Sequence, residues 1–262
     1  MKLSVVIPAH NEEGCIEETV KNLHDKLSHE HIDHEIIVVN DNSRDRTESI
    51  LVNVKRSISQ LKIINNAPPH GFGFAVRKGL ESFTGDAVAL YMADASDTPE
   101  DLVKYFRTLC QGYDCVFGTR WSRGGMAIDY PLHKMILNRL ANNFISLVFQ
   151  LRYNDTTNAF KMYRKHVING LQPLLSYHFN LTVELPLKAV VRGYSFAVVP
   201  NSWFNRKQGV SKLKIREMGS RYMFIVLYCL IEKWLSQRDY HRSKNPLVQA
   251  ATAKSLKPHG HS

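Results

Sequence analysis

Residues 34–40 read His-Glu-Ile-Ile-Val-Val-Asn, a short run rich in β-branched residues, and the polar sequence Asp-Asn-Ser-Arg-Asp-Arg-Thr follows directly at residues 41–47. An earlier apolar run lies at Leu3–Ile7, and a helical pattern extends between the two from about Glu12 to Leu27. Buried strands that alternate with helices are typical of a parallel sheet covered on both faces. Ligands of such folds bind beyond the carboxyl ends of the strands, so a functional site is expected in the loops there.

The same alternation continues to about residue 118 and then becomes less regular. The first part predicts further strands at Leu61–Asn65, Ala87–Met92 and Cys115–Gly118, and helices at about Asp45–Ser59, Phe72–Phe83 and Pro99–Leu109. The later part predicts helices at Pro131–Phe149, Leu181–Arg192 and Ile215–Leu235, and strands at Phe160–Tyr163 and Tyr194–Pro200. Pro186 predicts a kink in the second of these helices.

The composition fits one large folded domain that binds an anionic partner. The chain has 262 residues, 44% of them hydrophobic, and a formal net charge of +10. This balance suits phosphorylated substrates or an anionic membrane face, and no recognised module indicates a nucleic-acid partner. Four scattered cysteines indicate a reduced, cytoplasmic protein. We identify no signal peptide, and no apolar run reaches the ~18 residues of a spanning helix.

Carboxylates follow the first two predicted strands. The loop after the first strand reads Pro-Ala-His-Asn-Glu-Glu at residues 8–13, and Asp41 and Asp45 follow the second strand. A carboxylate at a strand end can bind ribose hydroxyls or the N–H groups of a base. Asp45 also suits the N-terminus of the following helix, where it would only be a cap.

The glycines do not form a dinucleotide-binding fingerprint. That fingerprint belongs after the first strand, where this chain has no glycine-rich loop. Gly71, Gly73 and Gly79 follow the third strand instead, with a different spacing. They indicate either a turn that approaches a phosphate or sugar, or close packing of a helix.

A third carboxylate, Asp94, lies just beyond the fourth predicted strand, and Ser96 and Asp97 follow it. Thr98 suits an N-cap and Pro99 the first helical position, so a helix begins here. An oxygen ligand at this place can hold a Mg²⁺ or Mn²⁺ ion that also binds phosphate oxygens. A turn rich in capping residues explains Asp97 better than it explains Asp94.

These motifs together resemble the family 2 glycosyltransferases of the GT-A fold, and within them the dolichol-phosphate mannose synthase group. The residues that carry the resemblance are Pro8-Ala9 with Asn11-Glu12-Glu13, Asp41-x-Ser43-x-Asp45-x-Thr47, Ala93-Asp94 before Pro99-Glu100, Gly118-Thr119-Arg120, Asn138-Arg139, Asp155 with Phe160-Lys161-x-Tyr163-Arg164, and Arg206-x-x-Gly209-x-Ser211-Lys212. The resemblance covers about Leu3 to Leu213. It implies a mixed, Rossmann-like sheet covered by helices in residues 1–213.

The resemblance also implies roles for individual residues. The nucleotide-sugar would be bound by Pro8, Ala9, Glu12, Asp41, Ala93 and Asp94, the metal by Asp94 and Ser96, and the acceptor phosphate by Arg120, Arg139, Ser211 and Lys212. The catalytic set would be Asp94, Arg120, Arg139, Arg206 and Lys212. The implied reaction moves mannose or glucose, with inversion, from a GDP- or UDP-sugar to a polyprenyl or dolichyl phosphate.

Two features bear on this reaction. A lipid phosphate is already an anionic nucleophile, so it needs neutralising cations more than a general base. One residue departs from the family pattern, because Met92 stands where the metal motif usually has a first aspartate, and a thioether is a poor ligand for a hard cation. Either Asp94 holds the metal together with diphosphate and water, or Asp97 or Ser96 helps, or activity is lost. We expect the first of these, with the metal bound more weakly than in relatives.

The predicted helix Ile215–Leu235 mixes basic and aromatic residues, which suits a membrane interface, although an ordinary core helix has the same pattern. We expect residues 214–238 to form this interface helix, 239–262 to be a disordered tail, and residues 137–149 to share the surface. The protein would then be peripheral at the cytoplasmic face of a membrane, with a membrane subunit as a candidate partner.

Two other interpretations stay open at this point. Transfer to a saccharide or lipid-linked acceptor would need a carboxylate base, for which Glu184 and Asp155 are the candidates. A nucleotide-sugar-binding subunit without activity would explain Met92. The arginines that suit an acceptor phosphate argue against such a subunit.

Overall fold

A computed structural model describes residues 1–205, 215–236 and 239 of the chain. The elements follow in the order β1 (Leu3–Ala9), α1 (Ile16–His29), β2 (His34–Asn40), α2 (Thr47–Lys55), β3 (Leu61–Asn65), α3 (Phe72–Ser82), β4 (Ala87–Leu90), α4 (Pro99–Cys110), β5 (Cys115–Thr119), β6 (Met126–Ile128), α5 (Leu132–Phe149), β7 (Lys161–Arg164), α6 (Lys165–Gly170), α7 (Leu181–Val191), β8 (Phe196–Pro200), β9 (Ser202–Phe204) and α8 (Ile215–Leu235). Apart from Asp239, the tail predicted to be disordered lies outside the described residues.

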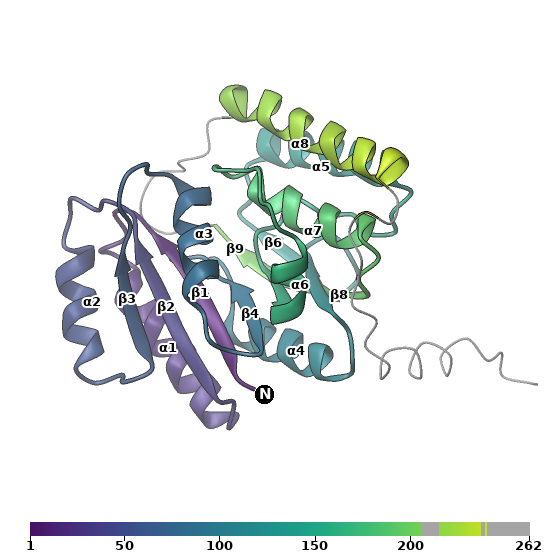
Figure 1. Cartoon of the computed structure of the whole chain (residues 1–262). Coiled ribbons are helices and arrows are strands. Elements are labelled where there is room, and N and C mark those ends of the chain that lie inside the picture. Colours follow the sequence, from purple (N-terminus) through teal and green to yellow (C-terminus); the bar gives the residue numbers. More distant parts are fainter. Residues whose placement is uncertain (206–214, 237–238, 240–262) are drawn as a thin grey trace, which may run out of the picture.

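Seven strands form one mixed sheet in the order β3-β2-β1-β4-β7-β5-β8 (Figure 1). The parallel pairing predicted from the strand–helix alternation holds for β1 with β2 and β4, for β2 with β3, and for β5 with β8. Strand β7 is the exception, since it runs antiparallel between β4 and β5. The mixed α/β fold is therefore confirmed, and β7 joins the regular half of the sheet to the later half.

Helices cover both faces of the sheet, so the strands are buried on both sides. On one face Leu3, Val5 and Ile7 of β1 pack among side chains of α1, α2 and α4. On the other face Val6 packs among side chains of α3, α6 and α7. This double burial explains why the sequence shows continuous apolar runs instead of an alternating pattern.

Two of the glycines after β3 are explained by close packing. A Cβ atom on Gly79 would lie 2.3 Å from Cγ1 of Val6, and one on Gly73 would lie 2.3 Å from the backbone carbon of Tyr177. Helix α3 can therefore approach β1 and the segment before α7 only where these side chains are missing.

The helix boundaries show where local sequence signals hold. The hydroxyl of Thr98 accepts a hydrogen bond from the backbone N–H of Asp101 (3.2 Å), and Pro99 begins α4, as predicted. Helix α1 begins at Ile16, later than predicted, because the carbonyl of Glu12 accepts hydrogen bonds from Cys15 and Ile16 in a separate turn. Strands β6 and β9, which form a small parallel sheet, were not predicted, because three-residue strands leave no pattern in the sequence.

Helix α8 lies along α5 and α7 at one end of the molecule (Figure 1). Its residues Ile225, Val226 and Cys229 are buried against α5 and α7, and the Arg192 guanidinium after α7 forms an ion pair with Glu232 of α8 (2.6 Å). Among the residues that the structure describes, no helix is both long and apolar enough to span a membrane. Part of α8 is thus a core helix, whereas its opposite face is exposed.

Candidate active site

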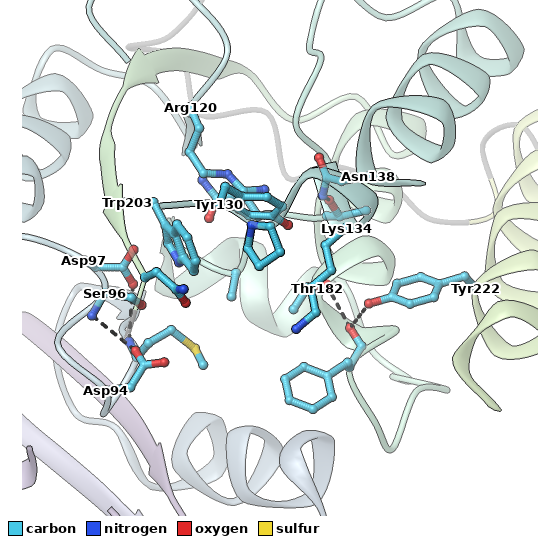
Figure 2. A pocket seen from close by; sticks show the side chains of 17 residues that line it. Asp94, Ser96, Asp97, Arg120, Tyr130, Lys134, Asn138, Thr182, Trp203 and Tyr222 are labelled. Atoms are coloured by element: carbon cyan, nitrogen blue, oxygen red, sulfur yellow. Dashed lines mark hydrogen bonds between the residues drawn. The ribbon is translucent and has the colours of Figure 1, made fainter. Parts of the chain in front are cut away.

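A cavity of about 550 Å³ opens beyond the carboxyl ends of β4 and β5 and the amino end of β7 (Figure 2). It is lined by Met92, Asp94, Ser96, Asp97, Arg120, Tyr130, Pro131, Lys134, Asn138, Thr157, Asn158, Ala159, Phe179, Thr182, Trp203, Asn205 and Tyr222. Three of the predicted site residues, Asp94, Ser96 and Arg120, therefore meet in one place. Figure 2 shows Asp94, Ser96 and Asp97 on one side of the cavity, with Trp203 beside them. Lys134, Asn138 and Tyr222 lie on the other side, and Arg120 and Tyr130 lie between the two groups.

The acidic end follows directly from the turn between β4 and α4. Asp94 accepts a hydrogen bond from the backbone N–H of Ser96 (3.2 Å), and Asp97 accepts one from the backbone N–H of Met92 (3.4 Å). Both carboxylates are buried, with residue exposures of 6% and 4%. Burial and the nearby charge of Asp94 raise the pKa of Asp97 to about 8. Two carboxylates thus face the same small volume, and the positive charge of Arg120 acts on Asp97 against the effects of burial and Asp94.

These residues fit a divalent cation. Asp94, Ser96 and Asp97 offer hard oxygen ligands, which Mg²⁺ and Mn²⁺ prefer, and a cation would also offset the repulsion of the two buried carboxylates. Within the described part of the chain, no group of three or more histidine, cysteine, aspartate and glutamate side chains forms a ready-made cation site. The remaining ligands would have to be water or substrate oxygens. Asp97, which the sequence offered as an alternative helping ligand, lines the same cavity as Asp94 and Ser96.

Asp41 organises the loop beside the first strands. Its carboxylate accepts hydrogen bonds from the side chain of Asn66 (2.9 Å), from Nδ1 of His70 (3.0 Å) and from the backbone N–H of Gly71 (2.7 Å). Its backbone carbonyl lies 2.6 Å from Nδ1 of His10. With only 5% of the residue exposed, Asp41 shapes the loop between β3 and α3 as well as the end of β2.

The other predicted nucleotide-sugar residues lie at neighbouring strand ends. Pro8 and Ala9 end β1, and the carbonyl of Ala9 accepts a hydrogen bond from the backbone N–H of Asp41 (2.8 Å). The backbone N–H of Glu12 donates to the Thr47 hydroxyl (2.9 Å), and Ala93 is buried in the core beside Asp94. None of these four residues lines the cavity, and neither does Asp41.

Asp45 acts as a structural cap. Its carboxylate accepts hydrogen bonds from the backbone N–H (3.0 Å) and hydroxyl (2.6 Å) of Thr47 and from the backbone N–H of Glu13 (3.1 Å). These bonds hold the start of α2 against the loop after β1. These contacts explain Asp45 as a structural residue at the start of α2, without a role in nucleotide binding.

Arg120 is held in place by Asp155. Its Nε and Nη2 atoms donate to the two carboxylate oxygens at 2.8 and 2.7 Å, and its backbone N–H donates to the same carboxylate (3.0 Å). Although burial works against the charge, Asp155 raises the pKa of Arg120 above its ordinary value. Nη1 is the guanidinium nitrogen that this carboxylate does not engage. The predicted phosphate ligand is thus a fixed cation that offers one edge to the cavity.

Arg139 lies behind the cavity wall, although the resemblance made it a phosphate ligand. Its Nη1 donates to the carbonyl of Asn154 (3.0 Å), and its guanidinium lies 5.3 Å from the ring of Trp121. On the same helix, Lys134 and Asn138 line the cavity instead. The i, i+4 spacing of Lys134 and Asn138 was the signal that could have identified Lys134.

Three predicted residues, Arg206, Ser211 and Lys212, lie outside the described residues. Asn205, which directly precedes that segment, lines the cavity. Among the residues that the structure describes, Arg120 and Lys134 are the arginine and lysine side chains of the lining.

The two candidate general bases are committed to other contacts. Asp155 pairs with Arg120, as described above. Glu184 is fully buried, accepts hydrogen bonds from the backbone N–H groups of Leu175 and Ser176 (both 2.7 Å), and forms an ion pair with Lys188 (2.6 Å). Neither carboxylate is placed to accept a proton from a substrate in the cavity.

Comparison with known proteins agrees with this geometry. Residues 4–171 match the family described as Glycosyl transferase family 2. The chain belongs to this family. Its mixed sheet is also that of solved glycosyltransferases: glucosyl-3-phosphoglycerate synthase from Mycobacterium tuberculosis, in complex with Mn²⁺, UDP-glucose and phosphoglyceric acid, superimposes with a TM-score of 0.64 at 17% identity, over 88% of this chain and 79% of that one. This likeness confirms the predicted GT-A fold.

Two of the similar curated proteins have names that refer to a phosphorylated polyprenol. A dolichol-phosphate mannosyltransferase of Pyrococcus furiosus is 30% identical over 217 residues, which are 82% of this chain and 60% of the relative. A polyprenol monophosphomannose synthase of Mycolicibacterium smegmatis is 26% identical over 215 residues, 80% of each chain. An uncharacterised glycosyltransferase of Synechocystis is 31% identical over 66% of this chain and 54% of its own length. The chain thus spans little more than half the length of two of these relatives.

Proposed function

We propose that this chain is an inverting hexosyltransferase that moves mannose or glucose from a GDP- or UDP-sugar to a polyprenyl or dolichyl phosphate. The observation that carries the proposal is the polarity of the cavity. Asp94 and Asp97 occupy one end, where a metal-bound diphosphate would be held. Lys134 lies at the other end and Arg120 lies between them, so an acceptor phosphate would meet both cations there. The named activities of two family members support the same acceptor class.

At the donor end, Asp94, Ser96 and Asp97 would hold Mg²⁺ or Mn²⁺. The ion would supply positive charge for the diphosphate that leaves when the glycosidic bond to the nucleotide breaks. Pro8 and Glu12, at and just after the end of β1, and Asp41, just after the end of β2, would contact the nucleoside. A protein of the same fold was solved in complex with Mn²⁺ and UDP-glucose, which supports a metal-dependent nucleotide-sugar donor.

At the acceptor end, the side chains act by charge. A phosphate oxygen attacks without losing a proton to the protein, so no carboxylate base is required. Lys134 and Nη1 of Arg120 would reduce the repulsion between the acceptor phosphate and the donor diphosphate, and would hold the attacking oxygen in place. The structural commitments of Asp155 and Glu184 favour this reaction over transfer to a saccharide hydroxyl.

The cavity adjoins a face that suits a membrane surface. Exposed apolar side chains lie on α5 at Leu132, Ile136, Leu137, Leu140, Phe144 and Leu147, and on α8 at Met223, Phe224, Leu227, Ile231, Trp234 and Leu235. We call these twelve residues the apolar face. Helix α5 has no acidic residue, and α8 has Glu217 and Glu232 against Arg216, Arg221 and Lys233. Glu232 is buried in its ion pair with Arg192. An apolar surface with a positive balance fits the interface of an anionic bilayer, which is where a polyprenyl phosphate resides.

We therefore place the protein peripherally on the cytoplasmic face of a membrane. The apolar face could also receive a membrane subunit, and binding to vesicles of pure lipid would separate the two cases. Vesicles containing phosphatidylglycerol should bind the full-length protein without any other polypeptide.

The proposed reaction is tested by transfer of labelled sugar to a short polyprenyl phosphate, with GDP-mannose, GDP-glucose, UDP-mannose and UDP-glucose as donors. We expect product from one donor, loss of product with chelator, and at least a 100-fold loss in Asp94→Ala. The matched control Asp45→Ala should keep most of the transfer activity, because Asp45 only caps α2. No product from any donor, with nucleotide binding intact, would contradict the proposal and favour a nucleotide-sugar-binding subunit without activity.

A further inference from the structure

Lys161 is a fully buried lysine at the start of β7. Only 1% of the residue is exposed. Its ammonium group donates hydrogen bonds to the backbone carbonyls of Thr156 (3.0 Å), Asn158 and Thr182 (3.1 Å). Three carbonyl oxygens are what the three N–H groups of a protonated lysine require, and a neutral amine has only two.

The contact with Thr182 follows from a proline four residues later. In α7 the carbonyl of Thr182 would normally accept a hydrogen bond from the backbone N–H of residue 186, but Pro186 has none. An unsatisfied carbonyl in this buried place would be costly. Lys161 satisfies it from the sheet, which explains how α7 continues as one helix through Pro186.

The carbonyls that Lys161 holds belong to two walls of the cavity. Thr182 lies on the wall formed by α7, and Asn158 lies on the loop before β7. The same loop carries Asp155, which holds Arg120. We propose that Lys161 is a positioning residue, whose ammonium group keeps these two walls in register so that Arg120 faces the acceptor. The effect on the acceptor rests on the function proposed above, whereas the contact between the two walls does not.

The charge of Lys161 is sensitive to pH near neutrality. Burial lowers the pKa of Lys161 to about 7, and the charge of Arg120 acts in the same direction, whereas Asp155 favours the charged lysine. When the pH rises through about 7, the ammonium loses one donor, so the contact between the walls should loosen. The free energy of unfolding, in contrast, should rise as the pH rises through this range. Between pH ~7 and ~10.5 the unfolded chain binds more protons than the folded one, so this group favours folding increasingly as the pH rises.

The first test needs no activity. The protein used is full-length Trp234→Phe that also carries Asp97→Asn, because Asp97 titrates in the same pH range. The fluorescence of Trp203, which lines the cavity, and Trp121, which lies beside Arg120, is followed from pH 5.5 to 9. We expect a transition near pH 7 that is absent in Lys161→Arg, because a guanidinium stays charged in this range. Lys188 is also fully buried, and Lys188→Arg should leave the transition in place. If the Lys161→Arg protein does not fold, Lys161→Met serves in its place. A transition that persists in the Lys161 variant would overturn the proposal.

The second test asks whether the positioning matters for transfer. The KM for a short polyprenyl phosphate should rise severalfold between pH 6.5 and 8 in the parent protein, with little change in the KM for the donor. In Lys161→Arg the acceptor KM should become nearly independent of pH, which a lysine with only a structural role would not produce. An equal change in both KM values would contradict the positioning role. If the parent protein transfers no sugar, the proposed function fails and the fluorescence result alone decides the role of Lys161.

Discussion

The two ends of the cavity are built in different ways. At the donor end, each functional carboxylate lies a few residues beyond a strand, and its position follows from local turns. At the acceptor end, Arg120 depends on Asp155, 35 residues away, and Lys134 is brought in by a separate helix. The carboxylates are thus placed by turns that are local in the sequence, whereas Arg120 is placed by a buried pair that is distant in the sequence. Substitutions at the two ends should therefore have different effects on stability and binding.

The largest effect is expected from breaking the buried pair at the acceptor end. Asp155→Asn would leave the Arg120 guanidinium buried with a neutral partner, and losing one member of a buried pair typically costs about 3–5 kcal/mol. Urea unfolding should show a destabilisation of this size. Asp45→Asn is the matched control, because an asparagine oxygen can keep the hydrogen bonds from Thr47 and only the bond from Glu13 is lost, at a cost of about 1 kcal/mol or less. Equal losses in the two variants would contradict the distinction between a buried pair and a local cap.

At the donor end, the corresponding test is the pH dependence of stability in a chelator. The pKa of Asp97 is raised from 3.8 to about 8, so the folded protein holds a proton there that the unfolded chain has lost. Between these values Asp97 makes the free energy of unfolding fall as the pH rises. We expect the wild type to lose more stability from pH 4 to pH 8 than Asp97→Asn, by more than ~1.4 kcal/mol, the equivalent of one pKa unit. Parallel curves for the two proteins would show that Asp97 is not held neutral by its surroundings.

The next effect separates two cations of α5. Lys134 lines the cavity, whereas Arg139 donates to a backbone carbonyl and lies over Trp121 behind the wall. Lys134→Gln should raise the KM for the acceptor about tenfold, which corresponds to ~1.4 kcal/mol of lost binding. Arg139→Gln should change it less than threefold. The opposite order would mean that Arg139 reaches the acceptor and that the role implied by the resemblance is correct.

These two arginines also show how far the sequence alone could go. The fold class, the order of the strands along the chain and the turn of Asp94 could be predicted, because periodicity, caps and strand ends are local. The sequence indicated Arg120 and Arg139 equally, since a motif shows which residues are present and not which direction they face. Lys134 went unnoticed among the basic residues of a helix, and only packing places it on the cavity.

The buried lysines illustrate the same limit. Nothing in the sequence distinguishes Lys161 from a surface lysine, apart from its place in a motif. Its partners are carbonyls of residues 156, 158 and 182, and a proline at residue 186 creates the need for one of them. Such a contact depends on the antiparallel insertion of β7 into the sheet, which the alternation of strands and helices did not predict.

The smallest effects are expected on the apolar face. Leu147 is 78% exposed and Trp234 is 64% exposed, so their removal should not disturb the core. Leu147→Ser and Trp234→Ser should each weaken binding to phosphatidylglycerol vesicles two- to fivefold, as measured by sedimentation, with the free energy of unfolding unchanged. Val52→Ser, an exposed apolar position on α2, is the control and should leave vesicle binding as it was. Full vesicle binding by a double variant at Leu147 and Trp234 would exclude this face as the membrane contact.

The central claim is that one cavity has a metal-assisted donor end and a cationic acceptor end. Calorimetric titration of the preferred nucleotide-sugar, with and without Mn²⁺, tests it most directly in the wild type, Asp94→Asn and Lys134→Gln. We expect Mn²⁺ to strengthen donor binding in the wild type and in Lys134→Gln, and to have no effect in Asp94→Asn. Donor binding that ignores Asp94, or that is lost equally in Lys134→Gln, would contradict the account.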